Sequence, residues 1–219
     1  MKKNTKFIEK YFLIALTIII FVIIIFAIII YFINKFNILK KNNKINITIF
    51  ASSKDIIDKE YFEKTRELIM KLNEIKDDIN VIYGGGDKGL MGEISKYKGN
   101  LISSNVTMFV TPTMKDEYVF DDINDRQEKL IELGDAYIIL PGGYGTHYEL
   151  LEVMTLNDIK ASNKPIIFYN INNFFDKFIN HLDDITNTKF ITNNLKEINA
   201  HIFYNSDEII QSIKSLHKN

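Results

Sequence analysis

The sequence contains no cysteine, only three prolines and only ten glycines in 219 residues. Without cysteine the chain cannot form a disulfide, a thiolate zinc site or a cysteine nucleophile. The four histidines lack the spacing of metal ligands, so no metal site is predicted. The formal net charge is −1, with acidic and basic residues interspersed, and this balance gives no electrostatic footprint for a nucleic acid polymer.

Eight of the ten glycines fall in two short segments, residues 84–92 (GGGDKGLMG) and 141–146 (PGGYGT), and no glycine follows Gly145. Each segment follows an apolar, β-branched run and precedes a stretch with helical periodicity. Glycine is costly inside regular structure, so this clustering indicates close approach of the backbone to a ligand. A helix N-terminus after a glycine turn offers free N–H groups and a positive dipole end to an anion. The two segments therefore predict a phosphorylated ligand held between them.

The chain divides into four predicted parts: a tail (1–10), a transmembrane helix (11–33), a tether (34–44) and a nucleotide-binding domain (45–219). The second part is apolar apart from Thr17, and as a helix it would be about 34 Å long, enough to cross a bilayer. Lysines flank it in almost equal number on both sides, so the positive-inside rule does not decide its orientation. The nucleotide-type ligand and the lack of cysteine place the domain in the cytoplasm, so a single-pass membrane protein with a cytoplasmic domain is predicted.

From residue 45 onward, segments with strand character alternate with segments of helical periodicity. This alternation predicts a Rossmann-like, doubly wound parallel sheet of the α/β class. Ligands of such sheets bind beyond the carboxyl ends of the strands, where Ser52, Ser53, Pro112 and both glycine segments converge. The predicted strands are 45–50, 80–83, 106–110, 135–140, 165–169 and 201–204; the predicted helices are 55–76, 89–97, 123–133, 146–157, 174–182 and 206–216.

Two charged residues near the predicted strand ends allow both a structural and a functional interpretation. Thr146 and Glu149 fit a capping box, but a carboxylate in the first turn after a glycine segment would also lie beside the sugar of a bound phosphate. Glu152, one turn further on, is expected to be solvated. Arg126 fits an ion pair with Asp122 or a snorkelling side chain, and equally a phosphate or carboxylate clamp facing the ligand.

The first glycine segment also spells the dinucleotide fingerprint, with Gly84, Gly86 and Gly89 at the required spacing. It follows the second predicted strand rather than the first, and no acidic residue ends the next strand to hold a ribose. NAD or NADP binding is therefore not favoured. Lys88 is interpreted as a turn residue that could touch a phosphate.

Together, GGG-x-x-GLMG at 84–92, an arginine before the next strand, and PGG-x-GT-x-x-E at 141–149 resemble the LONELY GUY family. Its members are cytokinin riboside 5′-monophosphate phosphoribohydrolases, often labelled lysine decarboxylases. The resemblance implies a Rossmann-like homodimer or larger assembly that cleaves the N-glycosidic bond of a nucleoside 5′-monophosphate, without metal or redox cofactor. It also implies two catalytic residues, Glu149 and Arg126, and a set of substrate- or phosphate-binding residues: Gly142, Gly143, Gly145, Thr146 and Thr155. The convergence at the strand ends adds Gly85, Gly86, Ser52 and Ser53 to the predicted binding residues.

The chain departs from the family pattern at four positions near these motifs: Asn124, Gln127, His147 and Tyr148 replace the usual His, Lys, Leu and Glu. The leading hypothesis is hydrolysis of a purine nucleoside 5′-monophosphate, with an AMP-like substrate whose adenine could carry an N6 substituent. The departures motivate an alternative, a catalytically inactive, membrane-tethered nucleotide sensor or scaffold. Pyridoxal-dependent lysine decarboxylation ranks last, because Lys88 is the only nearby candidate for a Schiff base. The predicted helices starting at Asp55 and Thr146 are equal candidates for a dimer interface.

Overall fold

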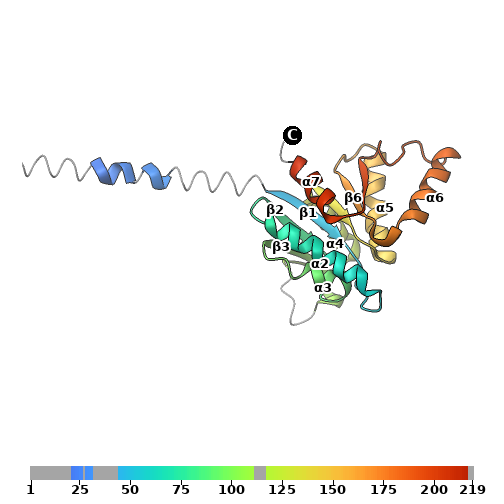
Figure 1. Ribbon diagram of the computed structural model, residues 1–219, viewed down its shortest axis with the longest axis horizontal. Helices are drawn as coiled ribbons and strands as arrows, with labels where there is room; N and C mark the ends of the chain where they lie inside the picture. The colour runs from blue at the N-terminus through green and yellow to red at the C-terminus, as the bar shows by residue number, and fades with distance from the viewer. Residues whose placement is uncertain (1–20, 27, 32–43, 111–116, 217–219) are drawn as a thin grey trace, which may run out of the picture. The chain divides into compact units, whose positions relative to one another are not determined.

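The computed structural model describes residues 21–26, 28–31, 44–110 and 117–216, and residues 45–219 form one compact unit. This unit alternates strands and helices along the chain (Figure 1). The strands are β1 Ile45–Phe50, β2 Ile79–Tyr83, β3 Asn100–Val106, β4 Tyr118–Phe120, β5 Ala136–Ile139, β6 Ile166–Tyr169 and β7 Ala200–Phe203. The α-helices are α2 Lys59–Glu74, α3 Gly89–Ile94, α4 Ile123–Leu133, α5 Tyr144–Asp158, α6 Asp176–Asn187 and α7 Ser206–Leu216.

The predicted transmembrane helix and the membrane localisation that rests on it are corrected by the structure. Within the part of the chain that the structure describes, no helix has both the length and the apolar character needed to cross a bilayer. Of the predicted span, only residues 21–26 and 28–31 are described, and both pieces are helical. The remainder of residues 11–33 lies outside the described residues.

The seven strands form one parallel sheet in the order β4-β3-β2-β1-β5-β6-β7. The chain builds outward from β1 to β4, then returns to place β5 on the other side of β1. The carboxyl ends of β1, β2 and β5 therefore meet where the strand order reverses. In open α/β sheets this reversal is where ligands bind. The predicted Rossmann-like sheet is confirmed.

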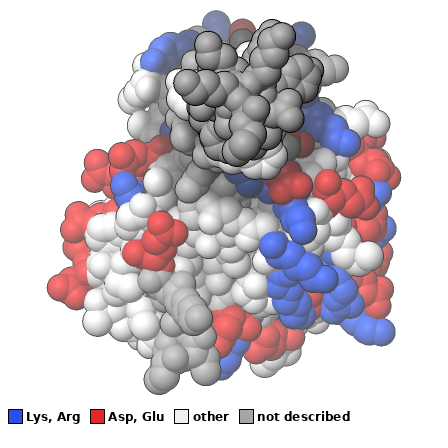
Figure 2. All heavy atoms as spheres, turned by 90° about the vertical axis from the view of Figure 1, so that its left-hand side faces the viewer, with Lys and Arg blue, Asp and Glu red and all other residues white. Residues whose placement is uncertain are grey.

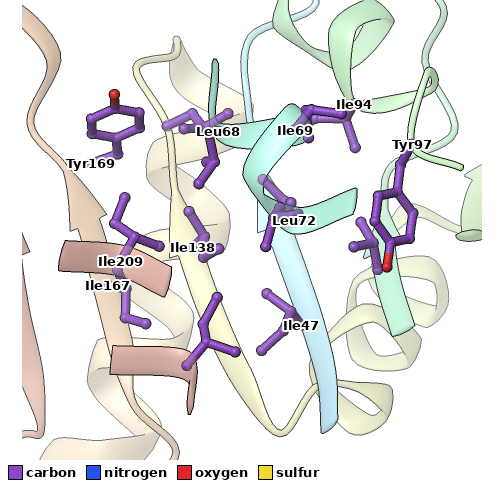
Figure 3. Close-up of a cluster of buried hydrophobic side chains, with 14 of the residues drawn as sticks. Ile47, Leu68, Ile69, Leu72, Ile94, Tyr97, Ile138, Ile167, Tyr169 and Ile209 are labelled. Atoms are coloured by element: carbon purple, nitrogen blue, oxygen red, sulfur yellow. The ribbon is translucent and has the colours of Figure 1, made fainter. Parts of the chain in front are cut away.

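Helices cover both faces of the sheet, which explains why the strands are nearly continuous apolar runs. Successive β1 side chains point to opposite faces, so Ile47 and Ile49 enter one core and Phe50 the other. The first core packs α2, α3 and α7 against the sheet, and Leu68, Leu72 and other members are drawn in Figure 3. The second core packs α4, α5 and α6. The two helices that follow β4 and β5 thus share one face.

The third predicted strand is wrong in its position, and one strand was not predicted. β3 ends at Val106, and residues 107–109 form a 3-10 turn instead of a strand. The strand is difficult to recognise because its buried end is polar, with Ser103, Ser104 and Asn105. Short β4 pairs with Ser104, Asn105 and Val106 at the edge of the sheet. Pro112 lies outside the described residues.

Acidic and basic side chains lie close together on the surface. On the face drawn in Figure 2, a group of Lys and Arg side chains lies directly beside Asp and Glu side chains. Ion pairs such as Lys71–Asp207 and Lys129–Glu132 join side chains of opposite charge on the domain. This mixture agrees with the near-zero net charge.

Candidate functional site

The end of β1 contacts both glycine segments through the backbone of Ser52. The Ser52 N–H donates to the Pro141 carbonyl (3.3 Å), and the Ser52 carbonyl accepts from the Met91 N–H (3.2 Å). Gly89 has φ +60°, and a Cβ there would lie 2.6 Å from the Ser53 carbonyl carbon. Glycine is thus required where α3 begins against the end of β1. The predicted convergence of the three segments is present in the fold.

Gly84, the first glycine after β2, makes room for the side chain of Arg126. A Cβ on Gly84 would lie 2.1 Å from Arg126 Nη2. The next residue, Gly85, has φ +78°, a conformation that side-chain-bearing residues rarely adopt. A Cβ on Gly86 would meet the Met91 side chain at 2.6 Å. The first glycine segment therefore forms a turn and also leaves space for the Arg126 guanidinium.

Arg126 comes from the second turn of α4 and points into the site. The helix begins at Asp122, whose carboxylate accepts from the Asn124 N–H (2.6 Å), so Asp122 is a cap rather than the side-chain partner of Arg126. Arg126 Nε donates to the Ser104 carbonyl (3.0 Å). Arg126 Nη1 lies 2.7 Å from Glu149 Oε1 and 3.5 Å from Gln127 Oε1. Its direction is therefore fixed by β3 on one side and by α5 on the other.

Glu149 is a buried carboxyl, 7 % exposed, and its recorded partner is Arg126. Burial raises the pKa of Glu149 above its usual value, and the Arg126 guanidinium opposes that shift through its charge and hydrogen bond. The nearby charge of Glu152 adds to the increase. A buried carboxyl with one cation and a raised pKa is typical of a reaction centre.

The second glycine segment leads into α5 two residues earlier than predicted. The helix starts at Tyr144 with Gly143 as N-cap, so Thr146 lies inside the first turn and no capping box with Glu149 forms. A Cβ on Gly142 would lie 2.1 Å from Thr146 Oγ1. At Gly143 and Gly145 a Cβ would meet no atom within 4 Å. Packing therefore does not require these two glycines, and the backbone there faces open space beside a helix N-terminus.

His147 attaches the start of α5 to the neighbouring α6 region. Its backbone N–H and its ring Nδ1 both contact the Gly143 carbonyl, at 3.0 and 2.9 Å. Because a carbonyl only accepts, Nδ1 carries the hydrogen. The ring packs against Phe174, Phe175 and Phe178. The residue that replaces the usual leucine thus holds the N-cap glycine in place.

Two predicted binding residues lie apart from this centre. Ser53 is exposed at the end of β1. Thr155 lies on α5 about 9 Å along the axis from Glu149, and its hydroxyl donates to the Leu151 carbonyl (2.7 Å). Thr155 lines a shallow hollow of about 320 Å³ together with Tyr148, Leu151, Glu152 and Leu156.

Some features of the site differ from the sequence-based expectation or have no sequence signal. Glu152 was expected to be solvated, but it is half-buried, and its Oε2 and Gln127 Nε2 are buried with no hydrogen-bond partner in the described structure. Two of the departures from the family pattern meet, because the Tyr148 hydroxyl donates to Asn124 Oδ1 (3.3 Å). The role of the Ser104 carbonyl has no sequence signal, since any residue supplies one. The described residues contain no cluster of three potential metal ligands.

A family profile described as "Possible lysine decarboxylase" matches residues 87–213, more than half of the chain. The chain belongs to this family. The resemblance to LONELY GUY proteins stated from the two glycine motifs is confirmed by relatives of that name. Cytokinin riboside 5′-monophosphate phosphoribohydrolase LOG2 of Arabidopsis thaliana is 27 % identical over 161 residues, which cover 69 % of this chain and 75 % of that protein. The enzyme LOG of Oryza sativa subsp. japonica is 32 % identical over 133 residues, covering 57 % and 55 %.

Solved structures similar to this member of the family support its fold. A molybdenum cofactor binding protein from Rippkaea orientalis has a TM-score of 0.55 at 16 % identity, covering 79 % of this chain and 97 % of that one. The molybdenum cofactor carrier protein from Chlamydomonas reinhardtii has a TM-score of 0.54 at 16 % identity, covering 80 % and 99 %. At this identity the similarity concerns the fold alone.

Proposed function

We propose that this protein hydrolyses the N-glycosidic bond of a nucleoside 5′-monophosphate and releases the free base and ribose 5-phosphate. The observation that carries the proposal is the buried Arg126–Glu149 pair, 2.7 Å apart, beside the open glycine backbone at the start of α5. The names of the curated relatives support the same reaction. A purine base, with an adenine that carries an N6 substituent as one form, is the proposed substrate class.

The proposed roles follow from the chemistry of the bond. Cleavage builds positive charge on the ribose ring, and a carboxylate beside the ring stabilises that charge, as in glycoside hydrolysis. Glu149 supplies this carboxylate, and Arg126 fixes its orientation through Nη1. The backbone N–H groups from Gly143 to Thr146, at the positive end of α5, hold the 5′-phosphate.

The lysine decarboxylase activity in the family description is not favoured by the candidate lysine. Lys88 is an exposed residue that precedes α3 as its N-cap. A Schiff-base lysine works desolvated or beside another cation. An exposed turn position provides neither condition, so the hydrolase remains the better proposal.

A homodimer is part of the proposal. Three large apolar side chains on α5 are exposed, Tyr144, Tyr148 and Leu151, whereas α2 exposes Met70. This difference supports α5 over α2 as the surface that a second copy would cover. Light scattering of the full chain, compared with a Leu151→Asp variant, tests this part: a wild-type monomer would contradict it.

The deciding experiment incubates the full chain with a panel of nucleoside 5′-monophosphates and identifies the products by mass spectrometry. Wild type is expected to release free base and ribose 5-phosphate in equal amounts. Glu149→Gln is expected to lose at least about 100-fold in turnover while binding of the nucleotide, measured by calorimetry, persists. Glu74→Gln, an exposed glutamate at the end of α2, is the matched control. Binding without any free base would favour the inactive sensor instead.

A further inference from the structure

The side chain of Met91 on α3 lies beside the guanidinium of Arg126. A Cβ on Gly84 would lie 2.1 Å from Arg126 Nη2, 3.4 Å from Arg126 Cζ and 3.3 Å from Met91 Sδ. The two side chains therefore meet at one point, directly after the end of β2. A Cβ on Gly86 would also meet Met91, at 2.6 Å from Cε and 3.1 Å from Sδ. The Met91 thioether thus fills the space between these two glycines and the guanidinium.

The Arg126 guanidinium has one nitrogen directed to Glu149 and another directed to Met91. Nη1 lies 2.7 Å from Glu149 Oε1, and Nε donates to the Ser104 carbonyl at 3.0 Å. Nη2 is the nitrogen that lies against Gly84, next to the Met91 sulfur. A thioether sulfur is only a weak hydrogen-bond acceptor. Met91 therefore packs against the guanidinium without drawing it away from Glu149.

A thioether in this position is open to one defined covalent change. A peroxide transfers an oxygen atom to the sulfur: the S–O bond forms, the O–O bond breaks, the sulfur is oxidised by two electrons and hydrogen peroxide is reduced to water. The resulting sulfoxide is polar, and its oxygen accepts hydrogen bonds. At Met91 this oxygen would lie beside Arg126 Nη2, in a space where even a Cβ on Gly84 does not fit. Both the attraction and the bulk of the oxygen therefore act on the guanidinium.

Met91 combines partial exposure with a place beside a residue proposed to be catalytic. Met91 and Gly86, which lies next to its terminal methyl, are both partly exposed, so a small peroxide has access to this side chain. Met70 on α2 and Met108 in the 3-10 turn after β3 are more exposed, at 63 % and 77 %. Oxidation of these two side chains adds a polar group that solvent already surrounds. Met154 on α5 is buried in the second core.

We propose that Met91 is an oxidation site and that its sulfoxide draws the Arg126 guanidinium away from Glu149, which stops hydrolysis. The inference rests on the proposed function for its effect on activity. The buried carboxylate of Glu149 is then left without its cation, and loss of one partner from a buried ion pair destabilises a fold. Oxidation of one sulfur therefore lowers both turnover and stability. Methionine sulfoxide reductases return the thioether and, with it, the ion pair.

The test treats the full chain with hydrogen peroxide and follows each methionine by peptide mass spectrometry. Base release from a nucleoside 5′-monophosphate is expected to fall in proportion to the fraction of Met91 that becomes sulfoxide, by about 10-fold or more at complete oxidation. Met70 and Met108 are expected to oxidise earlier and without loss of activity. The thermal midpoint is expected to fall by about 5 °C as Met91 reacts, and this readout requires no turnover. Reductases for both sulfoxide epimers are expected to restore activity and midpoint.

Met91→Leu is the critical variant, because leucine has a similar volume and no sulfur to oxidise. Each protein is compared with its own untreated sample, so the starting activity of the variant does not enter the result. Met91→Leu is expected to keep its rate and its thermal midpoint after peroxide, whereas Met70→Leu, the matched control, loses both as wild type does. Equal losses in Met91→Leu and wild type, or full activity of a protein whose Met91 is sulfoxide, would overturn the assignment.

Arg126→Gln separates displacement of the guanidinium from the mere burial of a polar sulfoxide. This variant lacks the ion pair from the start, so oxidation of its Met91 is expected to lower the thermal midpoint far less than in wild type. An equal fall in both proteins, or no fall in wild type, would overturn the displacement of Arg126. Absence of base release by untreated wild type from any nucleotide would instead contradict the proposed function, and the thermal midpoints would still decide whether oxidation of Met91 breaks the pair.

Discussion

A Cβ on Gly84 would lie 2.1 Å from Nη2 of Arg126, although the two residues are far apart in the sequence. The first glycine segment therefore serves two purposes: it turns the chain after β2 and it leaves space for a guanidinium from α4. The GxGxxG spacing in this segment therefore has a different structural role from the same spacing in dinucleotide-binding proteins.

Gly84→Ala is expected to reduce turnover of the nucleotide by about 100-fold, because the added methyl displaces the Arg126 guanidinium from Glu149. Steady-state kinetics on the full chain measures the loss. The thermal midpoint checks that the fold persists, since Arg126 is a side chain that can move aside. Unchanged kcat in a folded Gly84→Ala protein would contradict the proposed dependence on Arg126.

The raised pKa of Glu149 predicts how stability depends on pH. A carboxyl whose folded pKa exceeds its unfolded value stabilises the fold at pH values below the unfolded pKa, and this contribution is lost as pH rises through the folded pKa. The thermal midpoint of wild type minus that of Glu149→Gln is therefore expected to fall as the pH rises above the ordinary glutamate pKa of about 4.3. Calorimetric scans of both proteins over a series of increasing pH values measure the difference. A difference that grows with pH would show that the Arg126 guanidinium lowers the pKa of Glu149 by more than burial raises it.

His147→Leu is expected to weaken binding of ribose 5-phosphate by about 3- to 10-fold, because it removes the Nδ1 hydrogen bond to the Gly143 carbonyl. Leucine keeps the apolar contact with Phe174 and Phe178, so the fold should persist. Isothermal titration with ribose 5-phosphate gives the affinity. His201→Leu, an exposed histidine on β7, is the matched control. An equal change in both variants would contradict the proposed role of His147 in positioning the Gly143 backbone.

The far end of α5 is held by Asn157, whose Nδ2 donates to the carbonyls of Lys164 and Ile198, both at 2.8 Å. Asn157→Ala leaves these buried carbonyls without that donor, and we expect it to lower the free energy of unfolding by about 2–4 kcal/mol. Urea denaturation measures the change. Asn187→Ala, an exposed helical residue on α6, should change it by less than about 0.5 kcal/mol. Similar values for the two variants would contradict the anchoring role.

The sheet and the place of the glycine segments could be predicted from sequence because both depend on local patterns. Apolar runs such as 45–50 mark strands buried on both faces, and clustered glycine marks backbone near a ligand. β3 was not recognised because its buried end carries the polar residues Ser103, Ser104 and Asn105. The predicted membrane span is contradicted, because among the described residues no helix is both long and apolar enough to cross a bilayer.

The pairing within the site could only be predicted in part. Glu149 and Arg126 were both selected, but local rules paired each with its own helix, Glu149 with Thr146 and Arg126 with Asp122. In the structure they pair with each other, because the return of the chain from β4 to β5 brings α4 beside α5. The burial of Glu152 follows from the same packing of α4 beside α5, and no local sequence pattern predicts it.

The reversal of strand order beside β1 makes the site a joint product of the two halves of the domain: Ser52 and Gly84 come from one half, Arg126 and Glu149 from the other. Neither half alone can bind a nucleotide that spans both. By thermodynamic linkage, such a ligand would add its binding free energy to the cooperative unfolding of the whole domain, about 2.7 kcal/mol at a hundredfold excess over Kd. Bound substrate or product would therefore stabilise the whole domain against unfolding and would slow proteolysis at sites far from the ligand.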